Sequence, residues 1–204
     1  MNNRWNRVIY KLWSPIYDKF FNTGQFLRAR KKIFNNAPFQ DGQNVLFVGI
    51  GTGADLALVN HEKLKITAID ISPDMLNQAM TKYKDSTIHF LEMDAQNLMF
   101  KDNTFDVIVA SLILSVVPDA NRCFSEMKRV LKPNGQIMIF DKFAKRKDAW
   151  LKRLIRPIIR LFGTDIGLSF DKIFNHHDSG LEIIEDQPVL MSGMYRKIII
   201  QKSF

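Results

Sequence analysis

Three glycines at alternate positions, followed at a distance by an aspartate, are the residues of this sequence most suited to binding chemistry. Gly49, Gly51 and Gly53 follow the apolar run 45–48, and Asp70 ends a second apolar run seventeen residues after Gly53. Glycine has no Cβ, so the backbone can turn sharply and a ligand can lie close to it. An aspartate at the end of the next strand can accept hydrogen bonds from two ribose hydroxyls. Together they predict a nucleoside site in the first crevice of an α/β sheet.

The spacing of the glycines narrows the class of ligand. Dinucleotide-binding domains carry Gly-x-Gly-x-x-Gly, whose third glycine lets a helix and a strand pack around a pyrophosphate. This chain has Gly-x-Gly-x-Gly, which suits a ligand without a pyrophosphate. Residues 54–60 look helical, so we expect the first amides of that helix to face the ligand. A plain tight turn after a strand is the alternative for the loop taken alone.

The elements that position these residues follow from apolar runs and turn residues. Further strands are expected at 88–93, 107–110, 137–140, 180–185 and 196–201, with a helix at 119–131 between the fourth and fifth strands. Strands that alternate with helices predict an α/β sheet with helices on both faces.

In five segments the chain resembles the class I S-adenosylmethionine-dependent methyltransferases. These segments keep the family's order and are VLFVGIGTG (45–53), ITAIDIS (66–72), LEMDAQNL (91–98), DNTFDVIVASLILSVVPD (102–119) and RVLKPNGQIMIFD (129–141). Within the family the chain is most similar to the branch that holds quinone-ring methyltransferases and bacterial phosphatidylethanolamine N-methyltransferases. The resemblance implies S-adenosyl-L-methionine as the cofactor and a methyl acceptor that is small or lipid-like.

The resemblance and the order of elements predict one α/β domain over residues 1–204. The expected fold is Rossmann-like and doubly wound: a seven-stranded, mostly parallel sheet with an antiparallel last strand and helices on both faces. We divide the chain into an amino-terminal helical lid (1–40), a cofactor-binding core (41–142) and a substrate-side helix with the final strands (143–204).

The resemblance also implies which residues bind the cofactor. The three glycines would pass under its methionine part, and a lid residue would touch the methionine carboxylate. The predicted set is Gly49, Gly51 and Gly53, Asp70 at the ribose with Ile71 beside it, Asp94 and Ala95 at the adenine, Ser111 on the floor and Tyr17 in the lid. No catalytic base is assigned, because transfer from a sulfonium mainly needs alignment of the acceptor.

One position departs from the family pattern. The family usually has an acidic residue two positions before the first glycine, where it helps to hold the methionine ammonium, and this chain has Phe47. The departure leaves three alternatives open: weaker cofactor binding, a substitute polar group, or a non-catalytic binding protein on the same fold.

The composition indicates the cellular compartment of the protein and whether it holds a metal. The one cysteine, Cys123, cannot form an internal disulfide, which suits a reducing interior. No signal-peptide pattern opens the chain, and the longest uncharged apolar stretch, 107–117, is eleven residues, too short to span a bilayer. We therefore expect a cytoplasmic protein. The adjacent His176 and His177 have no further histidine or cysteine nearby, so no metal site is expected.

Positive charge is concentrated in two segments. The net charge is +8, yet residues 1–40 and residues 142–160 each hold eight Lys or Arg against one Asp. Both segments also carry an aromatic-rich apolar stripe at helical spacing, 5–21 in the first and 150–162 in the second. Basic amphipathic helices of this composition bind membrane interfaces. The simpler alternative is that both helices only cover the sheet.

The class of acceptor is inferred partly from absent motifs. Methyltransferases that act on exocyclic amines of nucleic acids carry a proline-containing turn after the fourth strand, and this chain has 110–113 without proline. The apolar residues that follow Ser111 suit a hydrophobic acceptor, and Tyr10 and Tyr195 could line its pocket. We therefore expect a lipid or small-molecule acceptor at the inner membrane face, with RNA methylation through the basic faces as the alternative.

Overall fold

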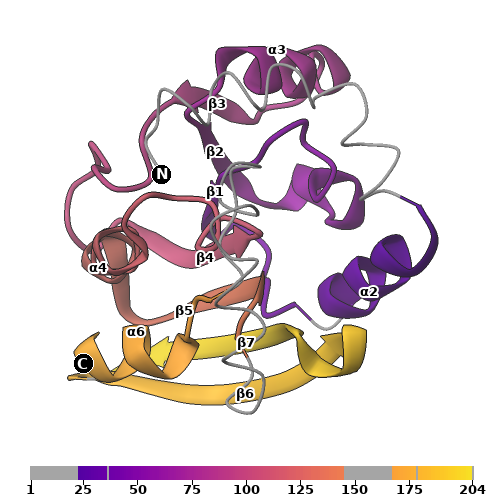
Figure 1. Cartoon of the computed structure of the whole chain (residues 1–204). Coiled ribbons are helices and arrows are strands. Elements are labelled where there is room, and N and C mark those ends of the chain that lie inside the picture. The colour runs from indigo at the N-terminus through magenta and orange to yellow at the C-terminus, as the bar shows by residue number, and fades with distance from the viewer. Residues whose placement is uncertain (1–22, 36, 145–166, 178, 204) are drawn as a thin grey trace.

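A seven-stranded sheet forms the centre of the computed structural model, which describes residues 23–35, 37–144, 167–177 and 179–203 (Figure 1). Its strands are β1 (Asn44–Val48), β2 (Lys65–Asp70), β3 (His89–Glu92), β4 (Phe105–Ser111), β5 (Leu131–Lys142), β6 (Leu181–Leu190) and β7 (Tyr195–Lys202). The strand order is β3-β2-β1-β4-β5-β7-β6. Strands β1 to β5 pair in parallel, whereas β7 runs antiparallel to both β5 and β6. The predicted doubly wound fold, with an antiparallel last strand, is confirmed.

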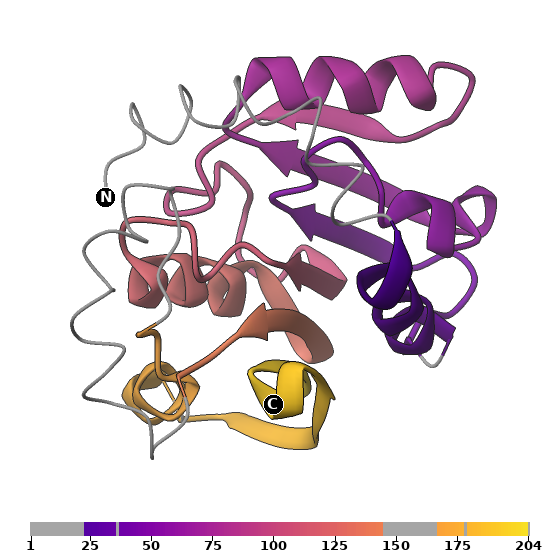
Figure 2. The same cartoon turned by 45° about the vertical axis from the view of Figure 1, so that its right-hand side comes forward.

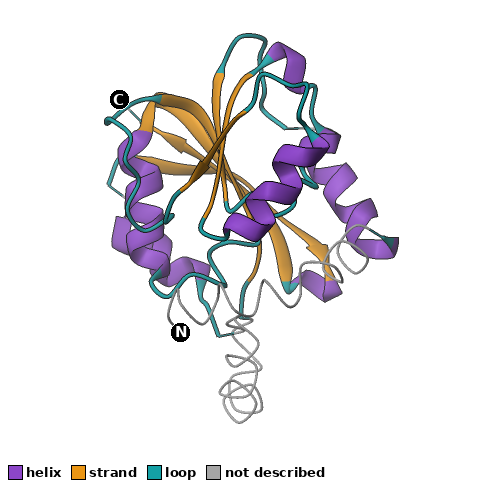
Figure 3. Cartoon of the chain, turned by 90° about the horizontal axis from the view of Figure 1, so that it is seen from above, coloured by secondary structure: helices purple, strands orange, loops and turns teal. Residues whose placement is uncertain are grey.

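Helices cover both faces of this sheet. In the described part of the chain they are α2 (Gly24–Asn35), α3 (Pro73–Lys82), α4 (Ala120–Val130) and α6 (Phe170–His177). Short 3₁₀ turns are present there at η1 (Leu56–Leu58), η2 (His61–Lys63) and η3 (Met191–Gly193). Figure 2 shows α4 and α6 on one side and α2 on the other. Figure 3, seen from above, shows the helices flanking the sheet. Each face therefore has a separate apolar core.

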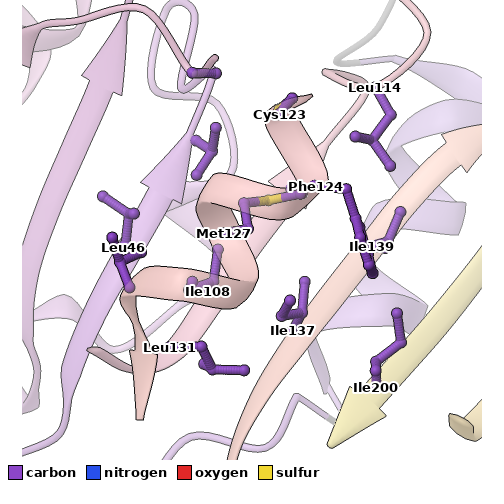
Figure 4. Close-up of a cluster of buried hydrophobic side chains, with 14 of the residues drawn as sticks. Leu46, Ile108, Leu114, Cys123, Phe124, Met127, Leu131, Ile137, Ile139 and Ile200 are labelled. Atoms are coloured by element: carbon purple, nitrogen blue, oxygen red, sulfur yellow. The ribbon is translucent and has the colours of Figure 1, made fainter. Parts of the chain in front are cut away.

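The core under α4 shows how local sequence produces this arrangement. Asp119 caps the helix, because its carboxylate accepts a hydrogen bond from the Arg122 amide at 3.0 Å. Cys123, Phe124 and Met127 recur on one face of the helix and are fully buried. They pack onto side chains of β1, β4 and β5 such as Leu46, Ile108, Ile137 and Ile139 (Figure 4).

The second core lies under α2 on the opposite face. Phe26 and Ile33 of α2 pack there with Phe47 of β1 and Phe140 of β5. Strand residues alternate between the two cores, so Leu46 faces α4 while Phe47 faces α2. The sheet is therefore buried on both sides, as expected for parallel strands.

Two elements differ from the sequence prediction. Residues 131–136, between the predicted helix and the predicted fifth strand, lie inside β5 as an irregularity, since Leu131 pairs with Phe105 and the regular ladder resumes at Gln136 opposite Val107. Asn134 has a φ of 62° there, a turn conformation that asparagine tolerates. Strand β6 also extends to Leu190, beyond the predicted end at residue 185.

The predicted lid and the second basic segment fall mostly outside the described residues. Tyr10, Tyr17 and the apolar stripes at 5–21 and 150–162 are not among them. Of the lid, the structure describes α2, which packs on the sheet. Within the described part of the chain, no helix is long and apolar enough to cross a bilayer.

Candidate cofactor-binding site

A pocket opens at the carboxyl ends of the parallel strands. Residues from four strand ends line it together with one residue of α3: Gly49, Gly51, Asp70, Ile71, Met75, Met93, Asp94, Ala95, Ser111, Leu112, Ile113, Val116 and Val117. Seven of the nine predicted cofactor-binding residues are in this set. Open α/β sheets bind ligands in such a crevice, beside the strand where the order reverses.

Gly53 and Tyr17 are the two predicted residues that the pocket lining does not include. Tyr17 lies outside the described residues. Gly53 faces α3 instead: a Cβ at this position would come within 3.0 Å of the Tyr83 ring and 3.2 Å of the Ala79 Cβ. Its φ of 79° also favours glycine. Gly53 therefore permits close packing of the loop on α3 and does not face the ligand space.

The predicted helix at 54–60 is wrong. The chain forms only the short turns η1 and η2 between β1 and β2. Val59 is extended, with φ −123° and ψ 150°, as suits a β-branched residue. The carboxylate of Asp55 does not cap a helix but binds Arg30 of α2. The amides of residues 54–60 are therefore not arranged as the start of a helix.

Asp70 organises the glycine loop from the end of β2. Its Oδ2 accepts a hydrogen bond from the Gly51 amide at 2.8 Å, and its Oδ1 accepts one from the Ser72 amide at 2.8 Å. Burial raises the pKa of the Asp70 carboxyl, while these amide hydrogen bonds act in the opposite direction. Each carboxylate oxygen has a second lone pair, so the two could still accept hydroxyl groups from a ribose.

Asp94 and Ala95 lie across the pocket, after β3. Asp94 Oδ1 accepts hydrogen bonds from the Gln96 amide at 2.9 Å and from the Gln96 side chain at 3.0 Å. Gln96 in turn accepts a hydrogen bond from the Asp119 amide at 2.9 Å. This chain of contacts fixes Asp94 relative to the start of α4.

An apolar wall, made of Leu112, Ile113, Val116 and Val117, follows Ser111. Leu112 has a φ of 57°, unusual for a bulky residue, and its amide donates to the Phe140 carbonyl at 2.7 Å. Such strain persists only where surrounding contacts enforce it, and it is common at binding sites. The sequence pointed to this apolar edge but left open whether it was only a buried strand end.

Asp141 holds the segment that carries the apolar wall, through Ser115, and was not predicted from the sequence. It is fully buried at the end of β5, where its Oδ2 accepts a hydrogen bond from the Ser115 amide at 3.0 Å. Burial raises the pKa of this carboxyl. Met75 and Met93 were also missed, since methionine in an apolar run carries no signal of a ligand.

Phe47 does not reach the pocket. Its side chain is 1% exposed and packs with Phe26 and Ile33 of α2 on the far face of the sheet. The ring therefore neither occupies nor blocks the crevice.

Tyr195 is also a core residue. Its ring meets the Phe26 ring edge-on at 5.3 Å, and it is not part of the pocket lining. Burial, with a smaller contribution from Asp141, raises the pKa of Tyr195 to about 12. The hypothesis that it lines the acceptor pocket has no support in this geometry.

Histidines and the cysteine lie away from the pocket. His176 and His177 end α6, and Cys123 is buried under α4, where burial raises the pKa of its thiol. Among the residues that the structure describes, no group of three or more His, Cys, Asp or Glu side chains could hold a metal ion.

Comparison with known proteins identifies the class that this fold and crevice define. The family described as "Methyltransferase domain" matches residues 46–139. The chain belongs to the class I S-adenosylmethionine-dependent methyltransferases, with S-adenosyl-L-methionine as methyl donor. This membership favours the enzyme over the non-catalytic alternative.

Two relatives show which branch of the methyltransferase family the chain is similar to. The chain is 32% identical to a phosphatidylethanolamine N-methyltransferase of Cereibacter sphaeroides over 95% of both proteins. It is 30% identical to a demethylmenaquinone methyltransferase of Listeria welshimeri, over 83% of this chain and 75% of the relative.

Solved structures support the fold. A methyltransferase of Aquifex aeolicus has a TM-score of 0.68 at 22% identity, covering 93% of this chain and 98% of that one. The [4+2]-cyclase SpnF has a TM-score of 0.70 at 19% identity, covering 86% of this chain and 80% of the cyclase. Because a cyclase shares the fold, the fold by itself does not give the reaction.

Proposed function

We propose that this protein methylates a lipid acceptor at a membrane surface, with the amine of a phosphatidylethanolamine-type phospholipid as the first candidate. The observation that carries this proposal is the match to a phosphatidylethanolamine N-methyltransferase along 95% of both chains. A similarity of that extent includes the segments at both ends, which the cofactor core alone would not require. A quinone ring is the second candidate, favoured by the similarity to demethylmenaquinone methyltransferase.

The cofactor would lie in the crevice described above. We propose that Gly49 and Gly51 pass under its methionine part, that Asp70 and Ile71 meet the ribose, and that Asp94 and Ala95 meet the adenine. The lining that the structure describes supports these roles, since all of these residues border one pocket. Tyr17 and the part of the lid that precedes α2 would close it.

The chemistry needs little from the protein beyond alignment. A sulfonium is an activated leaving group, and an unprotonated amine or a phenolate-activated ring carbon can attack its methyl carbon in line. The apolar wall from Leu112 to Val117 excludes water beside that path. On methylation of an amine, the positive charge of the sulfonium passes to the nitrogen, and the described pocket lining has no Lys, Arg or His that would repel it. The lining is therefore compatible with an amine acceptor.

The basic segments would contact the membrane surface. In the described part, Arg28, Lys31 and Lys32 of α2 are exposed. Each Lys or Arg near an anionic bilayer contributes about 1 kcal/mol of attraction. We propose attachment at the cytoplasmic face of the inner membrane, without a spanning segment.

Methyl transfer to vesicles tests the proposal. The protein is incubated with methyl-labelled S-adenosylmethionine and vesicles of phosphatidylethanolamine with an anionic lipid, and lipid extracts are assayed for label. We expect label in the monomethylated phospholipid and none with vesicles of phosphatidylcholine and the same anionic lipid. Label only in an added demethylated quinone would select the second candidate, and label only in added RNA would overturn the lipid proposal.

A further inference from the structure

A buried ion pair joins α2 to the glycine loop. Arg30 of α2 donates to Asp55 Oδ1 from Nε at 2.8 Å and from Nη2 at 2.6 Å. The two side chains are 6% and 9% exposed. Asp55 comes two residues after Gly53, so this contact ties the far end of the loop to a helix that lies 25 residues earlier in the sequence.

Two side chains at the end of α3, Lys82 and its C-cap Tyr83, hold the same loop. The Tyr83 hydroxyl donates to the Gly53 carbonyl at 3.1 Å, and Lys82 Nζ donates to the Thr52 carbonyl at 3.1 Å. At the near end, the Gly51 amide donates to Asp70. The loop is thus fixed by side chains of three different elements.

The local backbone supplies only part of this order, through hydrogen bonds from the Gly53 amide to the Ile50 carbonyl and from the Leu56 amide to the Gly53 carbonyl, both at 3.1 Å. After Gly53 the chain forms only the three-residue turn η1, whereas a full helix would hold the loop through its own hydrogen bonds. Glycines lose more conformational freedom on ordering than other residues, so a loop with three of them needs external contacts to keep one shape. The Arg30–Asp55 pair is the most buried of these contacts.

We propose that Arg30 and Asp55 are positioning residues for the cofactor: their ion pair holds the 49–53 loop in its binding shape. This inference rests on the cofactor site proposed above. The pair itself does not line the pocket, so it acts through the loop backbone. If the loop adopts its binding shape only part of the time, the apparent affinity for the cofactor falls in proportion to that fraction of time.

A stabilising role and a positioning role can be separated. A buried ion pair replaced by apolar residues of similar volume often leaves stability unchanged or raised, whereas removal of one partner leaves an unpaired buried charge. The double variant Arg30→Met/Asp55→Leu is therefore the informative one. Arg30→Lys keeps the charge but not both hydrogen bonds. Its affinity for S-adenosylhomocysteine should fall between those of the double variant and the wild type.

The matched control is a second, partly buried ion pair. Lys197 of β7 contacts Glu185 of β6 at 3.0 Å, with side chains 5% and 24% exposed, and neither lines the pocket. Lys197→Met/Glu185→Leu removes a comparable pair without touching the loop.

Calorimetry with S-adenosylhomocysteine, the demethylated product, gives the decisive readout, beside thermal unfolding and the KM and kcat for S-adenosylmethionine. We expect Arg30→Met/Asp55→Leu to fold and to bind about tenfold more weakly, with KM raised and kcat at saturation nearly kept. The control should bind within about twofold of the wild type. A folded double variant with wild-type affinity overturns the positioning role alone, whereas a wild type that does not bind overturns the proposed site as well.

Discussion

The side chain of Ile113 lies against Gly49. A Cβ added to Gly49 would come within 2.6 Å of Ile113 Cδ1, and Gly49 has a φ of 70°. The end of β1 and the loop after β4 therefore meet where only a hydrogen atom fits. Both residues line the candidate pocket, so the glycine loop and the apolar wall share one steric constraint.

Gly49→Ala should weaken cofactor binding because it adds both a clash and backbone strain. We expect a loss of about tenfold or more in the affinity for S-adenosylhomocysteine, and about 1 to 2 kcal/mol of strain for a non-glycine residue with this backbone conformation. Calorimetry and urea unfolding measure the two effects. In an Ile113→Ala background the clash is relieved, so Gly49→Ala should cause a smaller loss of affinity and stability. An equal cost in both backgrounds would show that Ile113 is not the neighbour that matters.

Asp70→Asn should disturb the site although it is nearly isosteric. Asparagine has one acceptor oxygen, while the Gly51 and Ser72 amides each donate to a different oxygen of Asp70. One amide would face an NH₂ group, which costs about 1 to 3 kcal/mol. We expect affinity for S-adenosylhomocysteine to fall by about tenfold or more. Asp85→Asn, at an exposed position after α3, is the control, and similar losses in both variants would refute the prediction.

Local patterns explain why the candidate crevice could be predicted. The glycine spacing, the apolar runs and the acid after the second run are all readable within short segments, and they place Gly51 and Asp70 on adjacent strand ends. The structure brings these two within hydrogen-bond distance. The cap at Asp119 and the buried stripe of α4 are local in the same way.

Features that depend on distant partners could not be predicted from the sequence. Residues 54–60 have a composition compatible with a helix, yet the pairing of Asp55 with Arg30 and the extended Val59 produce a short turn. The positive φ of Leu112 depends on the hydrogen bond to Phe140 in another strand. Arg30, one of the eight Lys or Arg counted in residues 1–40, is 5% exposed. Tertiary contacts override local preference at each of these positions.

Reversal of the α2 charges tests the membrane proposal. The triple variant Arg28→Glu/Lys31→Glu/Lys32→Glu should bind anionic vesicles more weakly by about 1 kcal/mol for each cation that meets the surface. Co-sedimentation at low salt measures this. The control Lys65→Glu/Lys84→Glu/Lys101→Glu has the same change in net charge at exposed positions elsewhere. Equal losses in the two triple variants would mean that net charge, and not the α2 face, governs binding.

Glu126 gives a pH-dependent contribution to stability. Its carboxylate accepts hydrogen bonds from Arg129 Nε at 2.9 Å and Nη2 at 2.8 Å, and from the Leu98 amide at 2.8 Å. The hydrogen bond from Arg129 holds the pKa of Glu126 below its ordinary value of 4.5. Since the pKa is lower in the folded state, the ionised form stabilises the fold above that ordinary value, and the stabilisation is lost as the pH falls through the folded pKa.

Glu126→Gln should therefore lower the free energy of unfolding by about 1 to 2 kcal/mol near neutral pH. At about pH 3 or lower the difference from the wild type should shrink, because a protonated glutamate and a glutamine offer similar hydrogen bonds. Urea unfolding of both proteins at the two pH values measures the change, and the exposed Glu62 serves as the control through Glu62→Gln, which should differ little from the wild type at either pH. A difference for Glu126→Gln that stays constant across the pH range would mean that packing, and not the charge on the carboxylate, accounts for the loss.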